Sequence, residues 1–142
     1  MKVILTVRDD WVAQLGSLMR AKRTGVWHSW VRADRRDIHS FSIEPNAFIE
    51  YANRCSRLPA RMRELGESHD LLELSYEEDI LAGAPASFQQ VFDFVGIPRV
   101  EITRLVSEKV APPPEDFITN IAELREFEAK VKAEAARTDL LA

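Results

Sequence analysis

Arg8 and Ser17 are the residues whose chemistry and spacing first indicate a ligand site. Arg8 directly follows the apolar run at residues 3–7, and Ser17 lies two to three turns into the helix expected after it. Open α/β folds bind ligands at the carboxyl ends of their parallel strands. A guanidinium there gives phosphate a bidentate, charge-assisted contact, and a hydroxyl adds a neutral donor. The pair predicts an anion site; the alternative is an arginine that ends a strand near an unrelated serine.

Tyr76 is the third candidate, because it follows a second apolar run at residues 70–75. If both runs are parallel strands joined by a helical crossover, Tyr76 emerges at the same sheet edge as Arg8. Its ring can stack and its hydroxyl can form hydrogen bonds. The alternative is a tyrosine that fills a gap beside a helix. The carboxylates at 77–79 favour a solvated turn over a metal site.

The elements that must position these residues follow from the apolar spacing. It predicts strands at 2–7 and 70–75, helices at 10–23 and 45–65, a helix opened by a capping box at Ser87–Gln90 and ended by Gly96 with Pro98, and a final helix marked by Phe117, Ile121, Leu124 and Val131. Residues 25–44 are expected to be irregular, and Pro59 to bend or split its helix. Pro112–Pro114 predicts a rigid extended spacer, and the charged residues of 123–137 predict ordinary solvated surface.

The order of several segments resembles the P-loop sulfotransferase superfamily, in particular its bacterial NodH-type members. These segments are Val3–Asp10, Val12–Gln14, Ser17–Leu18, Arg20–Ala21, Thr24–His28, Leu71–Glu78 and Ser87–Pro98. The resemblance covers most of residues 2–126. It implies an α/β fold, a partial P-loop sulfotransferase-like domain with a small parallel sheet packed by helices. It also implies that Arg8 and Ser17 hold the 3′-phosphate of the co-substrate PAPS, or of its product PAP, with Tyr76 against the adenine.

One part of the family pattern is expected to be absent. In the family, the loop that cradles the 5′-phosphosulfate lies N-terminal to the strand that ends at Arg8, and the five scattered glycines of this chain form no such loop. The catalytic base and the leaving-group lysine are also expected upstream, so no catalytic residue is assigned. Residues 1–142 are therefore expected to form a single partial domain without its N-terminal phosphosulfate-binding half. Residues 112–142 form its Pro-rich spacer and C-terminal helix.

The resemblance implies transfer of a sulfuryl group from PAPS to a hydroxyl of a carbohydrate or glycolipid-like acceptor. This chain would hold the 3′-phosphate and adenine side, and it is expected to be inactive alone. Two strands leave edges and faces in need of cover, so a homo-oligomer or a partner chain is expected to supply the missing half. The alternative is a non-catalytic, truncated or remnant module that acts in protein–protein association. A small P-loop kinase is a weaker alternative, since it too needs a phosphate loop.

Composition excludes several other classes. The 142 residues are 46% hydrophobic and 30% charged, as is typical of one globular domain. A net charge of −4 argues against a dedicated nucleic-acid binder. No run predicts a membrane span or a signal sequence. Cys55 is the one cysteine and lies on an apolar helix face, which predicts a buried, unreactive thiol and fits a reducing cytoplasm.

A basic segment at residues 20–36 carries Trp27 and Trp30 among its cations. The cations are Arg20, Lys22, Arg23, Arg32, Arg35 and Arg36. The segment could bind single-stranded nucleic acid or form the positive rim of a pocket for a nucleotide or anionic acceptor. The acidic composition of the whole chain favours the pocket rim. The three histidines, at 28, 39 and 69, lack metal-ligand spacing, and surface histidines are favoured over a role for His28 in the acceptor pocket.

Overall fold

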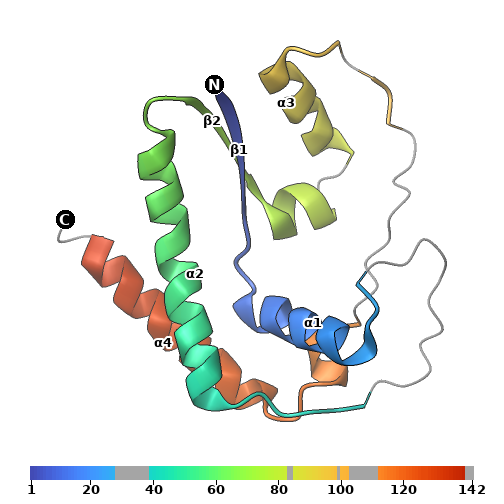
Figure 1. Cartoon of the computed structure of the whole chain (residues 1–142), viewed down its shortest axis with the longest axis vertical. Coiled ribbons are helices and arrows are strands. Elements are labelled where there is room, and N and C mark those ends of the chain that lie inside the picture. The colour runs from blue at the N-terminus through green and yellow to red at the C-terminus, as the bar shows by residue number, and fades with distance from the viewer. Residues whose placement is uncertain (28–38, 83–84, 99, 103–111, 140–142) are drawn as a thin grey trace. The chain divides into compact units, whose positions relative to one another are not determined.

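The computed structural model describes residues 1–27, 39–82, 85–98, 100–102 and 112–139 (Figure 1). In chain order the elements are β1 (Lys2–Val7), α1 (Trp11–Thr24), α2 (Pro45–Gly66), β2 (Asp70–Ser75), a short π-helix η1 (Tyr76–Ala82), α3 (Ala86–Val95), a 3-10 turn η2 (Pro114–Asp116) and α4 (Ile121–Asp139). The protein is thus α/β, with a small parallel sheet and a predominance of helix. The strands and the first two helices lie where the sequence predicts them.

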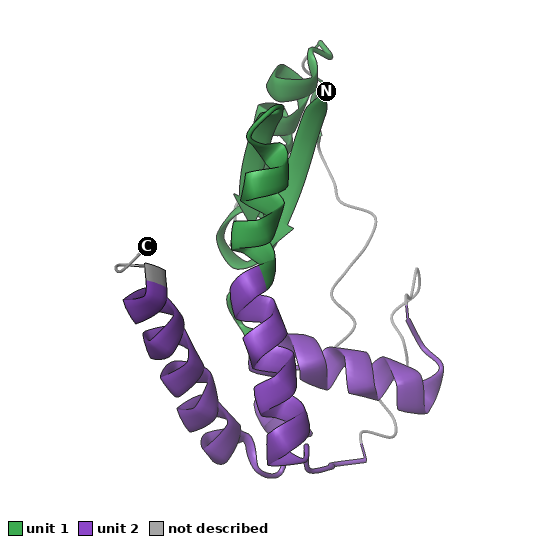
Figure 2. Cartoon of the chain, turned by 60° about the vertical axis from the view of Figure 1, so that its left-hand side comes forward, with its two compact units in different colours: residues 1–10, 58–106 green, residues 11–57, 107–142 purple. Residues whose placement is uncertain are grey.

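The chain divides into two compact units (Figure 2). Unit 1 comprises residues 1–10 and 58–106, and unit 2 comprises residues 11–57 and 107–142. Each unit therefore combines segments that are far apart in the sequence. The long helix α2 contributes its first part to unit 2 and its last part to unit 1.

Unit 1 contains the sheet. β1 pairs with β2 in parallel, from Lys2 opposite Asp70 to Val7 opposite Ser75, which confirms the predicted parallel pairing. Both strands are six residues long and end at the same register, so the residues that follow them emerge side by side. Arg63 near the end of α2 fixes this helix to β2 through a two-pronged ion pair with Glu73, with contacts of 2.5 and 2.7 Å. Within the described residues the sheet has these two strands.

Among the described residues, nearly all of the buried hydrophobic side chains belong to unit 2. Its fully buried side chains come from α1, α2, α4 and the segments that precede α2 and α4, and the largest are Val12, Ile43, Phe48, Phe117 and Leu124. The backbone of Phe41, before α2, pairs with the segment before α4. The Phe41 N–H donates to the Phe117 carbonyl at 2.8 Å, and the Phe41 carbonyl accepts from the Thr119 N–H at 3.0 Å. α1 and the 117–118 segment approach closely at Gly16, where an added Cβ would lie 2.6 Å from Ile118 Cδ1.

Unit 1 has much less buried apolar surface. Among its described residues, Leu74 is the single buried hydrophobic side chain. Large hydrophobic residues are exposed at the start of β1, on its helices and on the chain after α3: Met1, Ile4, Leu58, Leu65, Leu81, Val95, Ile97 and Val100. On the two strands, the apolar side chains other than Leu74 are half-buried or exposed.

Three sequence predictions about the helices need correction. The capping box is wrong, because Ser87 lies buried inside α3 and Pro85 precedes the helix with no side-chain cap. Pro59 does not split α2, which continues through it, so a local bend is what remains of that prediction. The triple proline is only partly extended: Pro113 has polyproline-like angles, whereas Pro114 starts η2. The left-handed Gly96 does end α3 as predicted.

Candidate functional site

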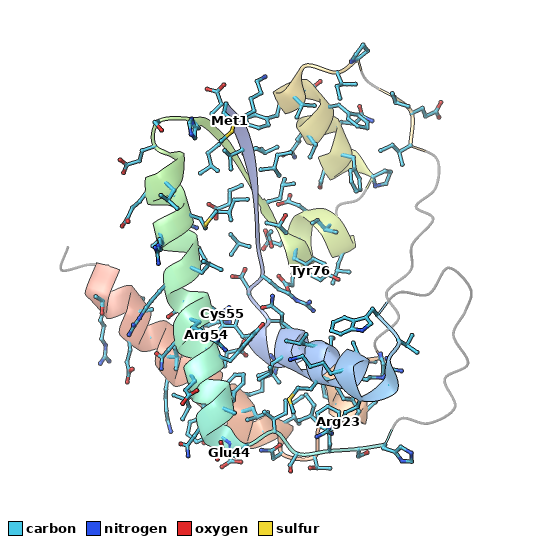
Figure 3. All side chains as sticks on the ribbon, viewed as in Figure 1. Met1, Arg23, Glu44, Arg54, Cys55 and Tyr76 are labelled. Atoms are coloured by element: carbon cyan, nitrogen blue, oxygen red, sulfur yellow. The ribbon has the colours of Figure 1, made fainter. Side chains whose placement is uncertain are left out.

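Arg8 and Tyr76 lie together at the carboxyl end of the sheet. They follow the last paired residues of the two strands, Val7 and Ser75. The Arg8 guanidinium carbon lies 4.3 Å from the centroid of the Tyr76 ring, which is a cation–π contact. This confirms the predicted proximity of the two side chains. Figure 3 shows Tyr76 where β2 passes into η1.

Glu77 completes this cluster with a carboxylate. It accepts hydrogen bonds from the backbone N–H of Asp9 at 3.0 Å and of Asp10 at 3.5 Å. The same carboxylate lies 3.4 Å from Nε of Arg8. The turn after β1 therefore directs two adjacent amides and a guanidinium at one anionic group. Arg8, Tyr76, Glu77 and the amides of Asp9 and Asp10 are called the strand-end cluster below.

The chemistry of this cluster suits an anion beside an aromatic ring. Consecutive backbone N–H groups form anion-binding concavities, and arginine recognises phosphate and carboxylate with the same planar donors. The side chain of Arg8 is only 17% exposed, so its charge is screened less than that of a surface arginine. One face of the Tyr76 ring is covered by this guanidinium, so a stacked base would use another part of the ring.

The acidic residues after Tyr76 have separate roles. Asp79 accepts a hydrogen bond from the Ser75 N–H at 2.7 Å, and the Glu78 N–H donates to the Ser75 hydroxyl at 3.2 Å. These contacts close the turn between β2 and η1. The Glu78 side chain is exposed. In the part of the chain that the structure describes, no three His, Cys, Asp or Glu residues are arranged to hold a metal ion.

Ser17, the third predicted ligand of the nucleotide, is half-buried on α1. It belongs to unit 2, whereas Arg8 and Tyr76 belong to unit 1. The pairing of Ser17 with Arg8 therefore stays a prediction.

Glu128 is a buried carboxylate that the sequence did not reveal. It is only 5% exposed and accepts a hydrogen bond from the Trp11 N–H at 2.7 Å, so it caps α1 from α4. Arg125 lies 2.9 Å and Lys132 3.4 Å from its oxygens. The expectation that the charged residues of 123–137 are all solvated surface is wrong at Glu128. Its i+4 spacing from the buried Leu124 is the one signal that could have indicated burial.

Cys55 is half-buried on α2, with its sulfur 4.0 Å from the Gln14 side-chain oxygen. Burial raises the pKa of the Cys55 thiol above its ordinary value, against smaller opposing contributions from Tyr51 and Arg54. A thiol with a raised pKa is largely protonated near neutrality, which supports the prediction that Cys55 is unreactive.

The basic segment at 20–36 is described only up to Trp27. The Arg23 guanidinium carbon lies 3.9 Å from the Phe41 ring centroid, and Trp27 is exposed. The other residues of the predicted pocket rim lie outside the described residues: His28, Trp30, Arg32, Arg35 and Arg36. The other two histidines are described, His39 as exposed and His69 as half-buried.

None of the helices in the described part of the chain is long and apolar enough to cross a membrane. No family model matches the chain, and no curated protein or solved structure matches it either.

Proposed function

We propose that this chain binds the 3′-phosphoadenosine part of PAPS as a portion of a P-loop sulfotransferase. The observation that carries the proposal is the convergence of Arg8, Tyr76 and two backbone amides at the carboxyl end of a parallel sheet. The resemblance of the segments around Arg8 and Tyr76 to the NodH-type family supports the choice of nucleotide. Arg8 and the amides would hold the phosphate, and Tyr76 would contact the base.

The cluster fits a phosphate on its own geometry. Two of its amides already donate to one anionic group, the Glu77 carboxylate, and Arg8 Nε lies 3.4 Å from it, so the arrangement is compatible with an oxyanion. PAPS supplies the sulfuryl group, and the acceptor would be a hydroxyl of a carbohydrate or glycolipid-like molecule. The residues assigned here bind and orient the nucleotide, and none of them is assigned the proton transfer. The chain alone is therefore proposed to bind nucleotide without transferring sulfate.

Calorimetry with adenosine 3′,5′-bisphosphate (PAP) tests the proposal. PAP should bind saturably, and Arg8→Ala should weaken binding by about 1.5–3 kcal/mol, the scale of a hydrogen bond to a charged group. Arg57→Ala is the matched control, because Arg57 is an exposed arginine on α2 and its loss should leave binding unchanged. Absence of PAP binding, or equal binding by the wild-type protein and Arg8→Ala, contradicts the proposal.

A second candidate function is protein–protein association without catalysis. The observation that favours it is the apolar surface of unit 1, where the described residues include one buried hydrophobic side chain and many exposed ones. A two-stranded parallel sheet is normally covered on both faces. We infer that another copy of the chain or a partner polypeptide covers this surface. One chain could both associate and bind nucleotide. Association that persists in a variant that no longer binds PAP would show that the two functions are independent.

A further inference from the structure

Glu77 is placed where the proposed nucleotide phosphate would bind. Its carboxylate accepts from the Asp9 and Asp10 amides and pairs with Arg8, and these are the donors assigned to the phosphate. Carboxylate and phosphate are both oxyanions that such donors recognise. An external phosphate that used these donors would have to compete with an internal glutamate.

The contacts of Glu77 are those of an exchangeable group rather than of a fixed structural cap. They measure 3.0, 3.4 and 3.5 Å, which is longer than the usual charge-assisted distance of about 2.7–2.9 Å. The Glu77 side chain is 28% exposed. Glu128 shows the contrasting case in the same chain, because its two hydrogen bonds measure 2.7 and 2.9 Å and its side chain is only 7% exposed. Its third contact, the ion pair with Lys132, measures 3.4 Å, so the contrast lies in the hydrogen bonds and the burial.

The position of Glu77 in the fold allows it to leave. It is the second residue of the seven-residue η1, directly after Tyr76, and it is half-buried rather than packed in a core. The neighbouring turn is held by Ser75 and Asp79, whose hydrogen bonds do not involve the Glu77 side chain. The Glu77 carboxylate can therefore swing towards solvent while the turn after β2 keeps its shape.

We propose that Glu77 is an internal competitor that occupies the phosphate position of the strand-end cluster and withdraws when a phosphorylated nucleotide binds. The inference rests on the proposed function, since it assigns a regulator to the same site. The apparent affinity for phosphate is reduced by the fraction of molecules in which Glu77 holds the donors. A monoester phosphate near neutrality carries more negative charge than one carboxylate. It can therefore bind the same donors more strongly and displace Glu77 from them.

The test compares Glu77→Gln with Glu78→Gln. The two residues are adjacent, and each variant removes one negative charge. The Glu78 side chain, however, is exposed, and Glu78 contributes its backbone N–H rather than its carboxylate to the hydrogen bond at this turn. Glu77→Gln should bind PAP about tenfold more tightly than the wild-type protein, which corresponds to about 1.4 kcal/mol. Glu78→Gln should stay within about twofold of the wild-type protein, because only general charge screening changes.

Inorganic phosphate is the second probe, followed by NMR at the Asp9 and Asp10 amides. These amide signals should respond to lower phosphate concentrations in Glu77→Gln than in the wild-type protein. If no variant binds PAP but this phosphate response is present, the nucleotide assignment fails and the competitor role stands. If Glu77→Gln binds both probes no more tightly than the wild-type protein, Glu77 is a scaffold for Arg8 and the inference is overturned.

Glu77→Asp covers the case in which Glu77→Gln does not fold. Aspartate keeps the charge but is one methylene shorter, so it should hold the amides less well, and phosphate should bind about threefold more tightly. Unchanged phosphate binding by a folded Glu77→Asp variant overturns the inference.

Discussion

At the scale of single residues, two glutamates organise the starts and ends of elements by binding backbone N–H groups. Glu77 receives the amides that follow β1, and Glu128 receives the first amide of α1. The N–H groups at the start of a helix have no partner within the helix, so an acceptor from elsewhere in the chain satisfies them. The two residues differ in burial. Glu128 is buried and anchors α1, whereas Glu77 is partly exposed and is proposed to exchange with a phosphate.

Replacing Glu128 with Ala should lower the free energy of unfolding by about 2–3 kcal/mol, because a buried, charge-assisted hydrogen bond to Trp11 is lost. Chemical denaturation measures this loss. Glu126→Ala is the matched control, since Glu126 lies exposed on the same helix and should change stability by less than about 0.5 kcal/mol. Equal effects of the two substitutions would mean that Glu128 does not anchor α1.

The sequence identified part of the candidate site for a clear physical reason. Arg8 and Tyr76 each end a bounded apolar run, so their meeting follows from parallel pairing alone. Glu77 and Glu128 were missed because their partners are backbone amides 68 and 117 residues away in the chain. Such contacts depend on tertiary packing, and no local pattern of residue types records them.

At the scale of elements, the strands were predictable because short β-branched, apolar runs bounded by polar residues have few alternatives. The start of α3 was not, because the Ser-x-x-Gln pattern also occurs inside a helix, and Ser87 is buried there. The close approach of α1 to the 117–118 segment was not predicted either, because a glycine inside a helical pattern does not indicate which segment packs against it. Gly16 makes room for Ile118.

Gly16→Ala should therefore destabilise the protein by about 1 kcal/mol, since overpacking outweighs the gain in helix propensity. The added Cβ would lie 2.6 Å from Ile118 Cδ1 and 3.2 Å from Phe117 Cε2. Chemical denaturation of the single and double variants tests the cause. Ile118→Val removes Cδ1, so it should cost less in the Gly16→Ala background than in the wild-type protein. Additive effects would show that the two side chains do not meet.

The ion pair between α2 and β2 gives unit 1 a pH dependence. The hydrogen bond from Arg63 lowers the pKa of Glu73 below its ordinary value of 4.5, and burial opposes this shift. The Glu73 carboxyl therefore loses its proton more readily in the folded protein than in the unfolded chain. The pair contributes stability above the unfolded pKa, and the contribution is lost as the pH falls through the folded pKa.

Glu73→Gln should remove this part of the acid sensitivity. Both side chains are more than a third exposed, so solvent screening limits the contribution to less than about 1 kcal/mol. Denaturation measured from about pH 7 to about pH 3 should give a shallower loss of stability for Glu73→Gln than for the wild-type protein. An NMR titration in which Glu73 shows an ordinary or raised pKa would contradict the assignment.

At the scale of the whole molecule, apolar burial is unequally divided between the two units. Unit 2 has an extensive core, whereas the described part of unit 1 presents many exposed hydrophobic residues around a two-stranded sheet. Soluble proteins normally protect exposed sheet edges and large apolar patches. The number of strands predicts that the sheet needs cover from another chain. The exposed hydrophobic side chains that such cover would bury lie in the described part of unit 1.

Light scattering should therefore give a mass above the 16.2 kDa of one chain, or show a stable complex with a partner. Replacing Leu58 and Leu65, both exposed on α2, with Gln should reduce association, because apolar burial drives it. The control is Ala60→Gln, an exposed position on the same helix. A wild-type monomer that transfers sulfate from PAPS to an acceptor unaided would contradict both the association and the proposal that this chain binds nucleotide without transferring sulfate on its own.

Amide NMR during a PAP titration shows whether the strand-end cluster binds the phosphate of a 3′-phosphorylated adenine nucleotide. We expect saturable shifts that are largest at Asp9, Asp10 and Tyr76, with little change at the exposed Lys130 on α4. Shifts centred instead on the basic end of α1 at Arg20–Arg23, or none at saturating PAP, would contradict this binding.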